Sequence, residues 1–196
     1  MAIVYPLAVP TTPGFSSVVW KPITVVGESV APTSLQAQTF VWPGQAWALS
    51  ATLPKVHTRE SADTWTAFLL AMNGKEGRCL LGDRTRPTTR GDAAGAKTVG
   101  AGAVALSTTL PVAGGTGAFV IGDWLQIGDY LHNVTQVNSA VSYDVWPRLR
   151  GAYVNGTVII YTNAKGKFKF VSNDVMQWAI DKMKHYDVEL DLVEAL

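Results

Sequence analysis

The segment from Gly122 to Arg150 is the part of this 196-residue chain that most restricts its fold. It contains two Gly-Asp pairs, at 122–123 and 128–129, which flank the short run 124–127. Gly-Asp pairs between short apolar runs are typical of the tight turns in an antiparallel meander. The segment carries no nucleophile beside a base and no set of metal ligands. It therefore predicts a β scaffold and shifts the functional question from catalysis to assembly.

β-Strand patterns dominate much of the chain. Residues 15–26 are rich in β-branched side chains and predict a strand that is interrupted at Pro22. Residues 35–42 and 47–53 predict two strands that are separated by a turn at Pro43–Gly44. Further strands are expected at 78–81, 103–106, 117–121, 124–127, 130–137, 141–146, 157–162 and 166–171. Their spacing favours a small barrel or a sandwich.

One α-helix is expected over residues 59–72. Its apolar residues recur at steps of three and four, which gives one buried stripe: Ala62, Trp65, Phe68, Leu69 and Met72. Thr58 is a suitable N-cap residue, and Asn73–Gly74 is typical of a left-handed C-terminal cap. The stripe predicts core packing and not a cofactor site.

The sequence therefore predicts an α+β fold that is mainly β with one clear α-helix. We expect a belt-like β-sandwich domain at 1–92, followed by an antiparallel β meander or small barrel at 93–171. A C-terminal segment, 172–196, is expected to pack back on the core. A short helix or turn that carries Met176, Trp178, Ala179 and Ile180 is expected after Ser172–Asp174. The final VELDLVEAL fits both helical and strand periodicity, so its conformation stays open.

Composition points to an assembly or to a large aromatic core. The chain is 47% hydrophobic and only 16% charged, and it contains seven Trp. So few charges protect a monomer poorly from association, although an aromatic core explains the composition equally well. The net charge of +1 gives no reason to expect binding to nucleic acid or to an anionic membrane. The N-terminus has no Lys or Arg before Lys21 and resembles neither a signal peptide nor a membrane span, so we expect a cytoplasmic origin.

Charge is distributed unevenly along the chain. Residues 75–97 hold six basic and three acidic side chains, whereas residues 181–196, which include Lys182 and Lys184, hold five acidic and two basic ones. Patches of opposite sign on one subunit can meet head to tail in a ring. A solvated loop and a solvated tail are the simpler alternative. The candidate contact residues are Arg84, Arg86, Arg90, Lys97, Asp187, Glu189 and Asp191.

No residue pattern predicts catalysis, a metal site or a cofactor. His57, His132 and His185 are dispersed and are expected to be structural. Cys79 is the only cysteine and is expected to be a small buried hydrophobe. Asp123 follows a turn glycine, where turn chemistry is a better explanation than acid–base chemistry. We therefore expect a protein that is not an enzyme.

Five stretches of this chain resemble tail-tip proteins of long-tailed bacteriophages. They are Trp65–Arg78, Leu80–Asp83, Gly122–Gly128, Leu131–His132 and Val145–Arg150. In such proteins a helix of the pattern W..FL..L.G..G.F.LGD precedes a GD.(I/L)Q.G..LH.V meander and a P.LR strand. The similarity covers most of residues 60–170 and is loose in the N-terminal third. Cys79 departs from the pattern, since these sequences often have an aromatic residue there.

The resemblance is to distal tail proteins or to closely related minor tail proteins. It implies a structural virion protein at the tail tip, made in the bacterial host cytoplasm. It also implies a ring, hexameric by analogy, that joins the tail tube to the baseplate hub. The partners would be further copies of the chain, the tail tube protein and the hub proteins. No large C-terminal carbohydrate-binding extension is present, so receptor binding is not expected.

A second function stays open from the sequence alone. The chain could be a small β-barrel binding module at the tail tip that presents Trp124, Tyr130 and Trp146 to a carbohydrate or a peptide. Exposed aromatic rings on the barrel would favour this function, and packed rings would argue against it.

Overall fold

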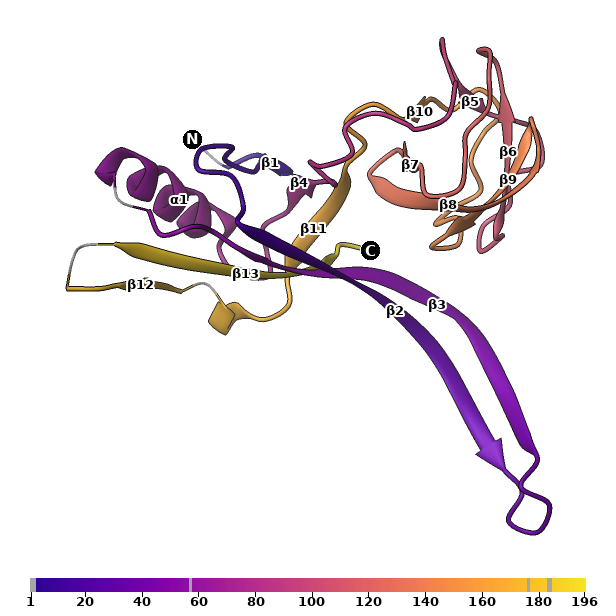
Figure 1. The fold of residues 1–196 in the computed structure, drawn as a ribbon, viewed down its shortest axis with the longest axis horizontal. Helices are drawn as coiled ribbons and strands as arrows, with labels where there is room; N and C mark the ends of the chain where they lie inside the picture. The colour runs from indigo at the N-terminus through magenta and orange to yellow at the C-terminus, as the bar shows by residue number, and fades with distance from the viewer. Residues whose placement is uncertain (1–2, 57, 176, 183–184) are drawn as a thin grey trace.

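The computed structural model describes residues 3–56, 58–175, 177–182 and 185–196. The expectations for His57, Met176 and Lys184 lie outside these residues. The described chain is mainly β with one α-helix, as predicted, and it forms a seven-stranded mixed sheet and a six-stranded antiparallel sheet (Figure 1). The mixed sheet combines strands from the expected belt-like domain at 1–92 with strands from residues 166–194, and the smaller sheet lies within residues 93–171.

The mixed sheet is built from both ends of the chain. Its strand order is β1–β4–β11–β13–β3–β2, and β12 pairs with the first half of β13. The bounds are Leu7–Ala8 (β1), Cys79–Leu81 (β4), Gly166–Phe170 (β11), Trp178–Ile180 (β12), Tyr186–Glu194 (β13), Ala37–Thr52 (β3) and Ser17–Val30 (β2). The β1–β4 pair is parallel and the other described pairs are antiparallel. The C-terminal residues, which fit two periodicities, are therefore a strand between β3 and β11.

The helix α1, Arg59–Met72, has the expected bounds and the expected buried stripe. The stripe joins one core with the inward residues of the mixed sheet, among them Leu49, Leu190 and Phe168. Asn73 adopts the left-handed conformation at the C-cap, as predicted. Thr58 differs from the expectation, because its hydroxyl bonds to the Ser61 hydroxyl at 2.9 Å and makes no side-chain cap.

The six-stranded sheet curls into a nearly closed barrel around its own core. Its order is β10–β7–β8–β9–β6–β5. The bounds are Thr98–Val99 (β5), Thr109–Ala113 (β6), Trp124–Ile127 (β7), Tyr130–Ser139 (β8), Ser142–Trp146 (β9) and Ile159–Ile160 (β10). The two ends of the sheet meet where the Val99 amide donates to the Thr157 carbonyl at 2.8 Å and the Ile159 amide donates to Lys97 at 3.0 Å. This closure leaves few open strand edges on the barrel.

Three expected strands are corrected by the structure. Residues 103–106 and 117–121 form turns and loops, not strands. Residues 166–170 form β11, which pairs with β4 and β13 and so belongs to the mixed sheet and not to the meander. The reason lies in its alternation, since Phe168 and Phe170 enter the core of the mixed sheet. After β11 comes a short 3₁₀ helix, Asn173–Val175. Trp178–Ile180, expected in a helix or turn, instead forms β12, because it pairs with β13.

Two prolines expected to break strands lie inside long strands instead. Pro22 pairs with Trp47 within β2, which is tolerated because β2 is an edge strand. Pro43–Gly44 is not a turn, because β3 runs through it, and the register of the pair shifts between Thr24 and Val26. The hairpin turn lies at the tip, at residues 31–36, where the Ala31 amide donates to the Gln36 carbonyl at 2.9 Å. β2 and β3 therefore form one long hairpin.

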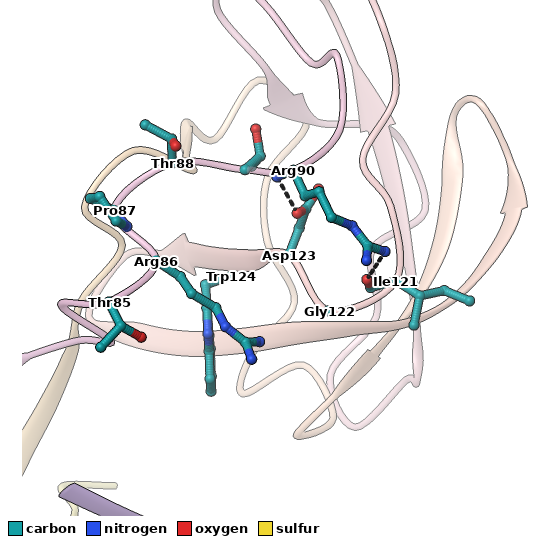
Figure 2. Close-up of a pocket in the computed structure, with 10 residues that line it drawn as sticks. Thr85, Arg86, Pro87, Thr88, Arg90, Ile121, Gly122, Asp123 and Trp124 are labelled. Carbon is teal, nitrogen blue, oxygen red and sulfur yellow. Dashed lines mark hydrogen bonds between the residues drawn. The ribbon is translucent and has the colours of Figure 1, made fainter. Parts of the chain in front are cut away.

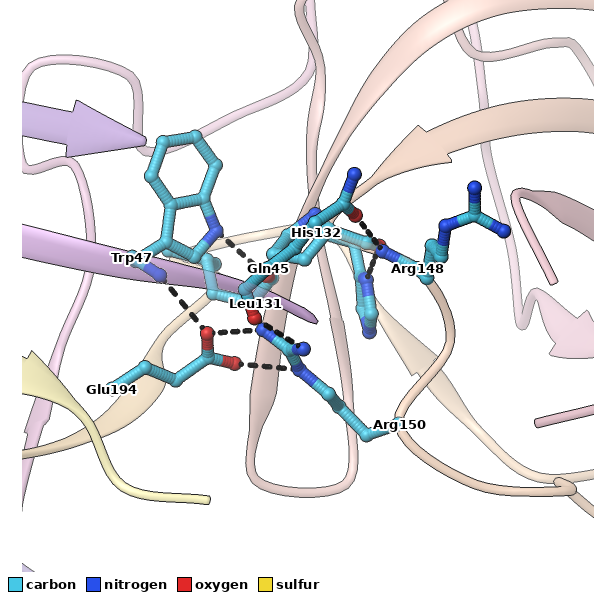
Figure 3. Close-up of polar contacts among 8 residues, drawn as sticks. Gln45, Trp47, Leu131, His132, Arg148, Arg150 and Glu194 are labelled. Carbon is cyan, nitrogen blue, oxygen red and sulfur yellow. Dashed lines mark hydrogen bonds and ion pairs between the residues drawn. The ribbon is translucent and has the colours of Figure 1, made fainter. Parts of the chain in front are cut away.

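A buried ion pair joins the mixed sheet to the barrel (Figure 3). Glu194 of β13 is 3% exposed and pairs with Arg150, which follows the barrel strand β9. Glu194 also accepts the Trp47 amide at 3.1 Å, and Arg150 donates to the Gln45 carbonyl at 2.7 Å. The Trp47 indole donates to the Leu131 carbonyl at 3.0 Å. These bonds fix the barrel against the base of the long hairpin.

Candidate functional site: assembly surfaces

The outer half of the long hairpin projects from the molecule as an arm, which we define as residues 24–44. Figure 1 shows it extending away from α1 and from the barrel. Strand β2 is the last strand of the sheet, and β13 pairs only with residues 48–52 of β3. Among the described residues, no strand pairs with either outer edge of the arm. The arm therefore offers two rows of unpaired backbone groups, one on each side.

The arm is apolar on both faces. Phe40 and Trp42, two residues apart on β3, lie on one face with ring centroids 6.4 Å apart. Val26 and Val41 pair with each other on the opposite face. Seven large apolar residues of the arm are exposed: Val25, Val26, Val30, Leu35, Phe40, Val41 and Trp42. A two-stranded ribbon is at best marginally stable in water by itself, so these faces are suited to contact with other protein.

One glycine is needed for the aromatic face of the arm. Gly27 pairs with Phe40, and the Trp42 ring lies directly over it. A Cβ atom at position 27 would lie 2.8 Å from a Trp42 ring carbon. A larger residue would displace the indole. The arm also carries a single charged residue, Glu28.

Two of the four expected basic contact residues have structural roles. Lys97 is only 4% exposed and donates to the Gly117 carbonyl at 2.7 Å, so it is no part of a basic surface. Its ammonium lies 5.8 Å from the centre of the Phe119 ring. Arg84 donates to the Pro10 carbonyl at 3.1 Å and lies over the Phe15 ring at 5.0 Å. Arg84 thereby anchors the N-terminal segment.

The other two, Arg86 and Arg90, line one pocket of about 490 Å³ (Figure 2). The pocket lies between the loop after β4 and the start of β7. Its other lining residues are Thr85, Pro87, Thr88, Thr89, Ile121, Gly122, Asp123 and Trp124. Asp123 is buried and accepts the amides of Arg90 and Val120, at 2.8 and 2.9 Å, as turn chemistry predicts. Both carboxylate oxygens of Asp123 therefore already accept a hydrogen bond, whereas the guanidinium groups of Arg86 and Arg90 keep unused donors.

The three expected acidic contact residues form a row on β13. Asp187, Glu189 and Asp191 are exposed and alternate with buried Val188, Leu190 and Leu192. Asp191 accepts the Ser50 hydroxyl at 2.5 Å. The side-chain carboxylates of Asp187 and Glu189 have no hydrogen bond or ion pair to any residue that the structure describes. They line a hollow of about 270 Å³ with Gln177, Trp178 and Ala179.

The aromatic residues of the alternative function are packed together. The Trp47 ring lies 5.1 Å from Trp124 and 4.2 Å from Trp146, measured between ring centroids. Trp20 lies 5.3 Å from Trp124 in the same cluster. These contacts take up ring surface that a bound sugar or peptide would need. Tyr130 is half-buried. The cluster is therefore better explained as part of the junction between sheet and barrel.

Two titratable groups with strongly shifted pKa values, Cys79 and His132, are buried in the fold. Burial raises the pKa of the Cys79 thiol to about 12. Burial lowers the pKa of His132 to about 4, and its Nδ1 lies 2.8 Å from the Pro147 carbonyl. Among the described residues, no three His, Cys, Asp or Glu side chains gather as metal ligands. Within the residues that the structure describes, no helix is long and apolar enough to cross a membrane.

Sequence reasoning missed the arm, which exposes seven large apolar residues. The signal was present, because residues 17–52 contain only two charged residues, Lys21 and Glu28, in a strand-forming stretch. Pro43–Gly44 obscures this signal, because the same two residues are typical of a turn. No protein-family model matches the chain, and no curated protein matches it significantly.

Proposed function

We propose that this chain is a structural virion protein that forms a ring at the tail tip of a long-tailed bacteriophage. The ring joins the tail tube to the baseplate hub. The proposal rests on the resemblance of two motifs in the same order, one of which forms α1 and β4 and the other the β7–β8 hairpin. By the same resemblance the ring has about six copies.

The observation that carries the proposal is the arm. It exposes apolar side chains on both faces, and its two unpaired edges lie on opposite sides of one ribbon. Edges on opposite sides support a head-to-tail contact, in which one edge of a copy meets the other edge of the next. Such contacts are heterologous and generate closed rings when the rotation between subunits closes.

The test is the mass of the purified protein by light scattering, with the Phe40→Ser/Trp42→Ser variant beside the wild type. We expect a discrete oligomer of several 21.0 kDa chains for the wild type and a monomer for the variant. Leu70→Ser is the matched control, since Leu70 is exposed on α1 and lies off the arm. An arm variant that keeps the wild-type mass, or a monomeric wild type, would contradict the proposal.

A further inference from the structure

We propose that the Arg86–Arg90 pocket of one copy receives the Asp187–Glu189 face of a second copy. This inference rests on the proposed ring and names the polar contact between its neighbouring subunits. The occupant is argued from charge complementarity. The two surfaces have opposite sign, the two guanidinium groups keep donors that no described residue uses, and the carboxylates of Asp187 and Glu189 have no ion pair to any described residue.

The pocket has guanidinium groups with donors to spare. Arg86 is 63% exposed in its side chain, and its ion pair with Asp83 is long, at 3.7 Å. Arg90 uses one nitrogen, which donates to the Ile121 carbonyl at 3.1 Å. In Figure 2 both side chains lie along the same hollow. Arginine presents its donors in a planar fork that matches a carboxylate, so two such groups suit a pair of acidic side chains.

The acidic face, Asp187 and Glu189, offers two carboxylates that accept hydrogen bonds. Asp187 and Glu189 project from the same side of β13, about 7 Å apart along the strand. Ala179, which pairs with Asp187 across the two strands, also lines the hollow beside them. Gln177 adds a further amide to its rim. A guanidinium that enters this hollow therefore meets two carboxylates that have no partner among the described residues.

The two surfaces lie on different parts of the molecule. Figure 1 shows β12 and the first half of β13 beside α1, whereas β7, which borders the pocket, lies in the barrel on the other side. The contact therefore joins two different patches, one from each copy. This is the head-to-tail arrangement that the two edges of the arm also favour.

The experiment uses two charge-reversal variants of the full chain. One variant, Arg86→Glu/Arg90→Glu, makes both surfaces acidic, and the other, Asp187→Lys/Glu189→Lys, makes both basic. We expect each variant alone to need at least about tenfold more protein than wild type to assemble. An equimolar mixture is expected to regain assembly as oligomers that alternate the two variants. Light scattering reads the mass, and Arg59→Glu/Lys75→Glu is the matched control because both residues are exposed on or beside α1.

The outcomes separate this contact from the ring itself. A wild type that never assembles overturns the proposed function and this contact with it. If both variants assemble at the same protein concentration as the wild type, the contact is overturned and the ring is not. The same follows if the mixture of folded variants assembles no better than either variant alone. If the Arg90 substitution disturbs the loop, the pair Arg86→Glu and Glu189→Lys serves for the same test. A third outcome is that both variants still form rings, and that oligogalacturonate binds the wild type but not Arg86→Glu. The pocket would then be a binding site for an acidic glycan and not a contact between copies.

Discussion

At the scale of single residues, His132 links the stability of the fold to pH. Its pKa is about 4 in the folded chain, below the ordinary value of 6.5, chiefly because burial disfavours the charged ring. Between these pH values the unfolded chain binds a proton that the folded chain does not. The free energy of unfolding should therefore fall by about 3 kcal/mol as the pH drops from 6.5 to 4. Urea unfolding across this range should show the slope, and His132→Asn should flatten it. An unchanged slope in the variant would contradict this role.

The buried pair of Glu194 and Arg150 makes a second prediction at the same scale. Removing one charge leaves the other buried without its partner, which costs about 3–5 kcal/mol. We therefore expect Glu194→Gln and Arg150→Met each to be strongly destabilising in chemical denaturation. The double variant Glu194→Gln/Arg150→Met should lose less stability than the sum of the losses of these two single variants. Strict additivity would show that the two side chains do not act as a pair.

At the scale of elements, the arm should be the least protected part of the free chain. Its amides on the outer edges have no partner among the described residues, so they should exchange with deuterium faster than those of β13. Assembly should then slow exchange in the arm more than in the barrel. Mass spectrometry of peptides from residues 24–44 would measure this. Equal protection of the arm in the free and assembled protein would remove it from the contact.

The elements also show how far the sequence could lead. The bounds of α1 were predictable because its apolar stripe and Asn73 act locally. The conformation of the final VELDLVEAL stayed open because its apolar residues fit both periods, and only its pairing with β3 and β11 decides for a strand with Asp187 and Glu189 outward. Pro43–Gly44 led to a wrong prediction of a turn, because Pro and Gly occur both in turns and at irregularities within strands. Only the pairing with β2 shows that β3 continues through these residues. Lys97 misled because its burial depends on the Gly117 carbonyl, twenty residues away.

At the scale of the whole molecule, two kinds of contact predict a mixed response to salt. Raising NaCl from 0.1 to 1 M shortens the screening length from about 10 to about 3 Å, which weakens contacts between exposed charges. The apolar arm is not weakened in this way. The dissociation constant of the ring should therefore rise several-fold without complete dissociation, and sulfate should oppose the rise because it strengthens apolar burial. Sedimentation in both salts would measure it, and complete dissociation in NaCl would contradict an apolar contribution.

The open edges of the arm also bear on how the protein must be produced. A long, nearly uncharged ribbon with free edges is a template on which identical chains can add without limit. A copy that meets no neighbour within its ring is thus a seed for fibrous aggregates. We expect a cell to tolerate this chain only when its supply is balanced by the structure that consumes it. Overproduction in isolation should yield insoluble protein beside the soluble ring, and shortening the arm should reduce the insoluble fraction.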